Sequence, residues 1–336
     1  MSDISGDDNV PHWAVSESIC CDKSYYLTTR CNGKRFYFIV DAEELKHGEL
    51  KEEFIEMVEN DDLELENWVA DAIVPVMREL APEAPESLTL AEFYNPETFL
   101  FKLVGSIDGE LSCIRLPDDA DPEAYNSPKI PLSEVPAAQR MIPAIDASAI
   151  PIIRMDREYF GADTPSKVLV DGKRYQFKPV QDEHSFLREL GILSKLSETG
   201  LNQKLRVPSI YSLVHYAGDK GSILGFLMEV IQFKSTLHDL ISHQKTEQHQ
   251  REKWMGQIED TVSQLHENGI VWGDVKPDNV LIDEEDNAWV VDYGGGFNLC
   301  FSVELQSYSG FVDEGVTETI EGDIQGVSRI KGWLGV

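Results

Sequence analysis

The pattern of hydrophobic and polar positions near the start of the chain predicts a β-hairpin. From Tyr25 to Val40, two β-prone runs lie on either side of the dipeptide Asn32-Gly33. This dipeptide tolerates the positive φ angles that a two-residue type I′ turn requires. We therefore expect two antiparallel strands joined directly at Asn32-Gly33.

Helical periodicity follows the hairpin. Apolar residues recur every three or four positions, which predicts two amphipathic helices with acidic outer faces. The positions are Leu50, Phe54, Met57 and Val58 in the first, and Leu65, Trp68, Val69, Ala72, Ile73 and Val76 in the second. Two further runs, Leu88 to Phe101 and Leu103 to Leu116, predict more strand around Asp108-Gly109. Residues 1–116 are thus expected to form a small α+β domain, and they contain no catalytic constellation.

A change of composition separates this region from the rest of the chain. Residues 117–151 hold seven of the sixteen prolines. Proline cannot donate a backbone hydrogen bond, so such a stretch typically runs extended over a surface. We predict a linker over residues 117–151 and a second domain over residues 152–336.

The second domain begins with another hairpin pattern. The segment Lys167 to Val180 turns at Asp171-Gly172, and its returning strand carries Lys178. A helix should follow, since Phe186, Leu190 and Leu193 form an apolar face with Glu189 beside it. Two strands and a longer helix come next, and that helix should end at Asn268-Gly269, a dipeptide that suits a left-handed stop.

Charge and composition exclude several classes of partner. The formal net charge is −31, from 60 acidic and 29 basic residues, so a polyanionic partner such as nucleic acid or an anionic membrane surface is disfavoured. No apolar run approaches the roughly twenty residues that span a bilayer, and the first thirty residues are acidic and polar rather than signal-like. The five cysteines form no CxxC pair. We expect a soluble protein of the cytoplasm or another reducing intracellular compartment.

The most informative stretch runs from Ile270 to Asp292. It contains WGDVKPDN, then a hydrophobic segment, then DYG. These motifs resemble the HRDLKPEN catalytic loop and the DFG turn of the protein kinase superfamily. The likeness covers about residues 150–336 and implies an α+β, protein kinase-like bilobal domain, with a β-rich N-lobe and a shortened helical C-lobe.

The resemblance also implies a role for each polar residue. Asp274 would accept the proton of an attacking hydroxyl, Lys276 would neutralise charge on the moving phosphoryl group, and Asn279 with Asp292 would hold Mg²⁺ against ATP. Nucleotide binding would fall to Lys178, to its partner Glu189, with Glu183 as a rival, and to backbone groups of Glu229 and Val230 at the hinge between lobes.

The chain departs from the family pattern at three places. There is no GxGxxG between Ile152 and Val170, where Gly161 is the only glycine. Trp272-Gly273 replaces His-Arg, which removes the usual partner of a phosphorylated activation segment. Only 44 residues follow Asp292; they resemble a short activation segment, from Tyr308 to Glu314, and one helix whose Asp323 would brace the catalytic loop. Such a compact C-lobe resembles divergent kinase-like proteins of fungi.

Two functional interpretations follow from these features. In the first, the protein is an ATP- and Mg²⁺-dependent phosphotransferase whose acceptor is a hydroxyl on a protein or a small molecule; the retained polar set favours it. In the second, it is a pseudokinase, a nucleotide-binding or partner-binding scaffold without turnover; the missing glycine loop favours that one.

Overall fold

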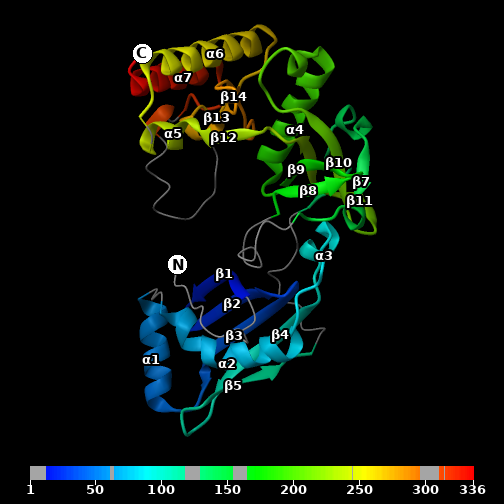
Figure 1. Cartoon of the computed structure of the whole chain (residues 1–336). Coiled ribbons are helices and arrows are strands. Elements are labelled where there is room, and N and C mark those ends of the chain that lie inside the picture. Colours follow the sequence, from blue (N-terminus) through cyan, green and yellow to red (C-terminus); the bar gives the residue numbers. More distant parts are fainter. Residues whose placement is uncertain are drawn as a thin grey trace. The chain divides into compact units, whose positions relative to one another are not determined.

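The computed structural model divides the chain into two compact units. It describes residues 13–60, 64–117, 129–153, 165–243, 245–295, 310–313 and 315–336. The first unit contains Met1–Ser127 and Ala147–Asp171, and the second contains Pro128–Asp146 and Gly172–Val336. Figure 1 shows both units.

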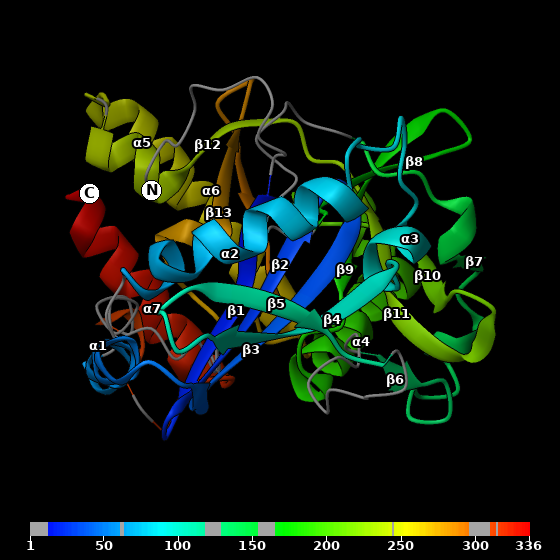
Figure 2. The same ribbon diagram turned by 90° about the horizontal axis from the view of Figure 1, so that it is seen from below.

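The first unit is a sheet with helices packed on one face. Its strands are β1 (Trp13–Cys21), β2 (Ser24–Cys31), β3 (Lys34–Leu45), β4 (Thr98–Gly105) and β5 (Leu111–Arg115), in the order β1-β2-β3-β4-β5. Only the β3–β4 pair is parallel, and α1 (Gly48–Glu59) and α2 (Leu65–Leu80) lie in the connection between these strands. Phe54 and Ile73 of the helices are buried against Phe36 and Phe38 of the sheet. Figure 2 shows α2 lying across this sheet.

The predicted first hairpin is confirmed, whereas one predicted strand is partly wrong. Asn32 and Gly33 have φ angles of 49° and 81°, as a type I′ turn requires. Within the predicted strand from Leu88 to Phe101, the short helix α3 (Leu90–Tyr94) forms instead. The reason is a capping box: the Thr89 side chain accepts a hydrogen bond from the backbone N–H of Glu92 at 3.2 Å, and the Glu92 carboxylate accepts from that of Thr89 at 2.8 Å.

The second sheet forms the β-rich lobe of the second half of the chain. Its order is β7-β10-β11-β9-β8, and β6 pairs with β11. The strands are β6 (Ile130–Pro131), β7 (Ala144–Asp146), β8 (Lys167–Val170), β9 (Lys173–Pro179), β10 (Ile210–Tyr216) and β11 (Asp219–Glu229). Helix α4 (Glu183–Thr199) packs on this sheet, with the Phe186 and Phe226 ring centroids 5.3 Å apart. The turn between β8 and β9 has positive φ at both Asp171 and Gly172, as predicted.

A short helical lobe completes the second unit. Three helices, α5 (Leu237–His243), α6 (Gln248–Glu267) and α7 (Ile320–Leu334), accompany a small sheet of β12 (Phe233–Thr236), β13 (Val280–Asp283) and β14 (Ala288–Val290). Figure 1 shows α6 and α7 side by side. Short 3-10 helices lie at Gln139–Met141, Leu201–Gln203 and Pro277–Asn279 in this unit, and another lies at Ala147–Ala149 in the first unit. The fold is therefore α+β, with a β-rich lobe followed by a shortened helical lobe, as the sequence predicts.

The proline-rich stretch is more ordered than a simple linker. Ile130 and Val135 are buried in the core of the second unit, and β7 pairs with β10. Isolated apolar residues between the prolines are enough to anchor the chain, and edge positions tolerate proline. The described part of this stretch is thus packed rather than extended over a surface. The compact units divide the chain at other residues than those predicted. The division into residues 1–116, 117–151 and 152–336 stays a prediction.

Candidate active site

The loop after α6 gathers three of the predicted site residues. Helix α6 stops at Asn268, and Gly269 follows with a φ of 64°. Beyond this turn, the Asp274 carboxylate accepts hydrogen bonds from Lys276 Nζ and from Asn279 Nδ2, each at 2.8 Å. Asn279 Nδ2 also donates to the Asp274 carbonyl at 2.9 Å. Lys276 and Asn279 thus both contact Asp274 within the same loop, and they hold its carboxylate in one orientation.

The surroundings of Asp274 favour proton uptake. Its side chain is only 12% exposed. Burial raises the pKa of Asp274 above its ordinary value, the Lys276 ammonium opposes this rise, and the Asp292 carboxylate adds to it. A carboxylate whose pKa is raised towards neutrality is a better proton acceptor than one in water.

A second cluster joins the β-rich lobe to the DYG turn. Lys178 on β9 forms ion pairs with Glu189 of α4 and with Asp292, whose Oδ1 lies 2.8 Å from Lys178 Nζ. Glu189 is buried, with 2% of its side chain exposed. Glu183, the rival candidate for the partner of Lys178, is exposed in the first turn of α4. The structure therefore brings Lys178, Glu189 and Asp292 together.

The pKa shifts in this cluster follow from burial and charge. Burial alone would lower the pKa of Lys178, but the Glu189 and Asp292 carboxylates outweigh it and raise that pKa above its ordinary value. Burial would raise the pKa of Asp292, but the Lys178 ammonium, together with Lys276 and the Gly294 N–H, outweighs it and lowers that pKa. For Glu189, burial dominates and the pKa is raised despite the Lys178 pair. Lys178 therefore stays charged between two carboxylates.

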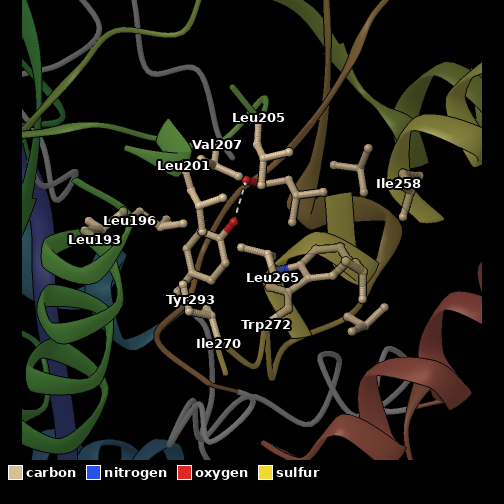
Figure 3. Packing of buried hydrophobic residues seen from close by; sticks show 14 of the residues in the cluster. Leu193, Leu196, Leu201, Leu205, Val207, Ile258, Leu265, Ile270, Trp272 and Tyr293 are labelled. Carbon is tan, nitrogen blue, oxygen red and sulfur yellow. Dashed lines mark hydrogen bonds between the residues drawn. The ribbon is translucent and has the colours of Figure 1, made fainter. Parts of the chain in front are cut away.

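The backbone at the DYG turn is anchored beside Asp292. Asp292 has a φ of 62°, a left-handed conformation that non-glycine residues seldom adopt. The next side chain, Tyr293, is fully buried, and its hydroxyl donates to the Val290 carbonyl at 3.2 Å (Figure 3). It packs among leucines from α4 and the chain after it, including Leu193 and Leu201 (Figure 3). Packing of Tyr293 therefore holds the Asp292 carboxylate towards Lys178.

A buried carboxylate braces the loop from the side of α7. Asp323 has 0% of its side chain exposed, and it accepts hydrogen bonds from the backbone N–H groups of Trp272 and Gly273, each at 2.7 Å. His266 Nε2 lies 2.8 Å from the same carboxylate. The Trp272 indole donates to the Val291 carbonyl at 2.9 Å. These bonds tie α6, α7 and the loop to the strand that leads into Asp292.

Replacing Asp323 with alanine is expected to destabilise the second unit by about 3 kcal/mol or more. Two buried N–H donors would lose their acceptor, and each such loss costs about 1–3 kcal/mol. Calorimetric unfolding of the whole chain measures this effect. The matched control is Asp260→Ala, since Asp260 is exposed and, among the described residues, its carboxylate accepts from Gln264 on the same helix. An equal, small effect of both substitutions would contradict the bracing role.

The predicted hinge residues, Glu229 and Val230, belong to neither of these clusters and line a pocket of about 430 Å³. Its lining is Asn202, Val207, Ser209, Glu229, Val230, Ile231, Gln232, Asp283, Glu284, Glu285 and Trp289. The backbone N–H of Glu229 donates to the Ser209 carbonyl at 2.9 Å, and its carboxylate pairs with Lys173 at 2.9 Å. This N–H is therefore committed within the protein. The nucleotide-binding role of Glu229 and Val230 stays a prediction.

Some sequence features fall outside the described residues. Gly161 lies in 154–164, and the predicted activation segment is described only at 310–313. Within the described ranges, no group of three or more His, Cys, Asp or Glu side chains is arranged to hold a metal ion. The described helices also include none that is long and apolar enough to cross a membrane.

Sequence reasoning missed Arg188. A charged residue on an amphipathic helix ordinarily indicates a solvated face, yet this side chain is only 14% exposed. Its guanidinium donates to the carbonyls of Trp272 and Tyr293, next to both motifs. The glycine at position 273, where the kinase motif has an arginine, is the sequence signal that another element could supply the positive charge there.

The part of the chain that holds these residues also matches a known protein family. Residues 168–311 match the family model described as "Protein kinase domain". The chain is 26% identical over 127 residues to "Hormonally up-regulated neu tumor-associated kinase homolog A" of Xenopus laevis, covering 38% of this chain and 18% of that protein. It is 29% identical over 117 residues to mouse "Sperm motility kinase Z", covering 34% of this chain and 23% of that protein.

A fungal relative shows the same level of similarity. The yeast protein "Serine/threonine-protein kinase PKH2" (Saccharomyces cerevisiae) is 27% identical over 122 residues, covering 36% of this chain and 11% of that protein. The chain thus spans less than a quarter of the length of these three relatives. Two of the three come from vertebrates, so the comparisons support the superfamily more broadly than the fungal group.

Proposed function

The chain carries a domain of the protein kinase-like superfamily, and on this premise we propose that it transfers the γ-phosphoryl group of ATP to a hydroxyl acceptor with the help of Mg²⁺. The observation that carries the proposal is the Lys178–Glu189–Asp292 cluster, in the same unit as the Asp274–Lys276–Asn279 cluster. A scaffold that only binds a partner does not need both of these clusters of polar side chains.

Asn279 and Asp292 fit a magnesium site. Magnesium binds oxygen ligands, and it usually takes only one or two of them from protein carboxylates while phosphates and water supply the others. Asn279 Nδ2 donates to Asp274, so its amide oxygen is the atom left for a cation. The Asn279 carbonyl accepts a hydrogen bond from the Val291 N–H at 3.0 Å, which fixes the backbone just before Asp292. When bound, Mg²⁺ would neutralise charge on the nucleotide phosphates.

The remaining residues have separate roles in the transfer. Lys178 binds a nucleotide phosphate, and Glu189 holds Lys178 in place. Asp274 orients the acceptor hydroxyl and takes its proton as the new oxygen–phosphorus bond forms and the bond to the ADP oxygen breaks. Lys276, 2.8 Å from Asp274, places a positive charge where the phosphoryl group moves.

One observation favours the scaffold alternative. The segment between Ile152 and Val170 lacks the glycine-rich pattern that covers the phosphates in kinases. A pseudokinase that binds nucleotide or a protein partner without turnover would not need that cover. We propose that the acceptor hydroxyl is on a Ser/Thr side chain or on a small molecule. We also propose that the protein is soluble and intracellular. Nucleic acid and anionic membranes are poor partners for a chain with a net charge of −31.

Melting temperature with nucleotide and metal tests the proposed site. We expect ATP with Mg²⁺ to raise the melting temperature. At a hundredfold excess over Kd, binding adds about 2.7 kcal/mol to the free energy of unfolding, and ATP alone should add much less. Asp292→Ala should abolish the metal-dependent part, because it removes a metal ligand. The matched control is Asp286→Ala, since the Lys234–Asp286 pair has the same side-chain exposures, 33% and 40%, as the Lys178–Asp292 pair. Unchanged metal-dependent stabilisation in Asp292→Ala would remove the assignment.

A further inference from the structure

Arg188 links three parts of the site from its position next to Glu189 on α4. Its Nη2 donates to the Val271 carbonyl and its Nη1 to the Trp272 carbonyl, both at 3.1 Å. Nη1 also donates to the carbonyl of Tyr293. One guanidinium thus joins the helix that carries Glu189, the loop that leads into Asp274 and the turn that follows Asp292. Its planar fork suits several carbonyls at once, which a lysine ammonium would not reproduce.

Gly273 provides the space that Arg188 occupies. Gly273 has a φ of +87°, and a Cβ added there would lie 2.8 Å from Arg188 Cζ. A side chain at position 273 and the Arg188 guanidinium therefore exclude each other. In the kinase loop that WGDVKPDN resembles, this position is the arginine of HRD. The positive charge missing from the loop is here supplied by the neighbouring helix.

Glu318 places a carboxylate beside this guanidinium. Its Oε2 lies 3.5 Å from Arg188 Nε, and its side chain is 24% exposed. Glu318 has a φ of 58°, a left-handed conformation that non-glycine residues seldom adopt. A Cβ added at Gly295 would lie 3.0 Å from Glu318 Cδ, so the carboxylate also packs against the chain just after the DYG turn.

We infer that Arg188 and Glu318 form a permanent clamp that assembles the site without phosphorylation of the segment after Asp292. Kinase activation segments are commonly ordered by a new pair between an arginine and a phosphorylated residue. Here the arginine comes from α4 and the anion is a fixed carboxylate. Arg188 is a positioning residue: it holds Glu189, the Asp274 loop and the Asp292 turn in one register. This inference rests on the proposed function for its effect on turnover, but not for its effect on loop order.

The test uses conservative variants of the full chain made without phosphorylation, as verified by mass spectrometry. Arg188→Lys keeps the charge but not the fork, and Glu318→Gln keeps the shape but not the charge. We expect each to lower kcat by about tenfold with little change in the KM for ATP, a coupling of ordinary size between two sites. The double variant should be no worse than Arg188→Lys alone, because both changes break one interaction. Glu259→Gln, in the exposed Lys331–Glu259 pair, is the control and should leave turnover unchanged.

Amide hydrogen exchange provides a readout that needs no turnover. Residues 270–279 and Tyr293 should exchange faster in Arg188→Lys and in Glu318→Gln, and not in Glu259→Gln. Unchanged exchange at these amides, or additive effects in the double variant, would overturn the clamp. So would a parent that becomes active only after its segment is phosphorylated. A parent without any turnover would contradict the proposed function, and exchange would still decide the clamp.

Discussion

Replacing Lys178 with methionine should both weaken the fold and impair nucleotide binding. Glu189, with 2% of its side chain exposed, would be left without a cation beside it. Breaking a buried ion pair costs about 3–5 kcal/mol, and we expect the lower end, near 3 kcal/mol, because Lys178 is 33% exposed. Loss of a charged hydrogen bond to phosphate should weaken Mg²⁺-ATP affinity by about tenfold to a hundredfold.

The pH dependence of that variant identifies the cause. Burial already raises the pKa of Glu189 above its ordinary value of 4.5, and loss of Lys178 would raise it further. Above the ordinary value, folded Glu189 then binds more protons than unfolded Glu189, so stability falls as the pH rises from 4.5 towards the folded pKa. Glu189→Gln added to Lys178→Met should recover most of the stability and remove this pH dependence. A double variant as unstable as Lys178→Met would contradict the pairing.

Asp274→Asn should lose turnover by about a hundredfold or more while binding Mg²⁺-ATP about as well as the parent, because removing an acid-base group has an effect of this size. The amide keeps the shape of the carboxylate but cannot take the proton of the acceptor hydroxyl. Nucleotide binding depends instead on Lys178 and the metal ligands. Initial rates of phosphoryl transfer and calorimetric titration with Mg²⁺-ATP separate the two effects. Equal turnover in parent and variant would show that Asp274 does not act on the acceptor.

The same region needs a shape-matched control. Asn279 Nδ2 and Lys276 Nζ both donate to the Asp274 carboxylate, so Asp274→Asn also alters two hydrogen bonds. Asp219→Asn at the start of β11 makes a comparable change away from the site, because that carboxylate accepts from the Gly221 N–H at 2.9 Å and the Ser222 hydroxyl at 2.6 Å. A loss of turnover confined to Asp274→Asn would therefore belong to the reaction and not to packing.

Much of the fold could be predicted from the sequence because it depends on interactions between residues close together in the chain. The Asn32-Gly33 and Asp171-Gly172 turns were predictable because few dipeptides tolerate positive φ at both positions. The loop from Asp274 to Asn279 was identified by its resemblance to the kinase motif, and its polar groups, close in sequence, do contact one another. In contrast, the Leu90–Tyr94 helix depends on a capping box at Thr89 that a β-prone run conceals. Local competition between cap and strand decided that segment.

Long-range contacts set the limit of sequence reasoning in the site. Lys178 and Asp292 are 114 residues apart, and their spacing alone does not place them in contact. The resemblance to the kinase superfamily supplied the expectation that both residues serve one nucleotide site, but not that they pair directly. Arg188 lay beyond it, because its partners are mainly backbone carbonyls, which leave no trace in side-chain patterns. The packed proline-rich stretch was missed for a similar reason, since a few buried residues such as Ile130 and Val135 decide its path.

The most direct test of the central claim is transfer of label from γ-labelled ATP by the parent protein, followed over time with Mg²⁺ and with the metal chelated. Protein acceptors, small-molecule hydroxyls, the chain itself and water should all be offered, with Asp274→Asn measured side by side. The proposed mechanism predicts labelled product that requires Mg²⁺ and is lost by about a hundredfold or more in Asp274→Asn. Absence of metal-dependent transfer to every acceptor in the parent would contradict it and leave the protein as a binding scaffold.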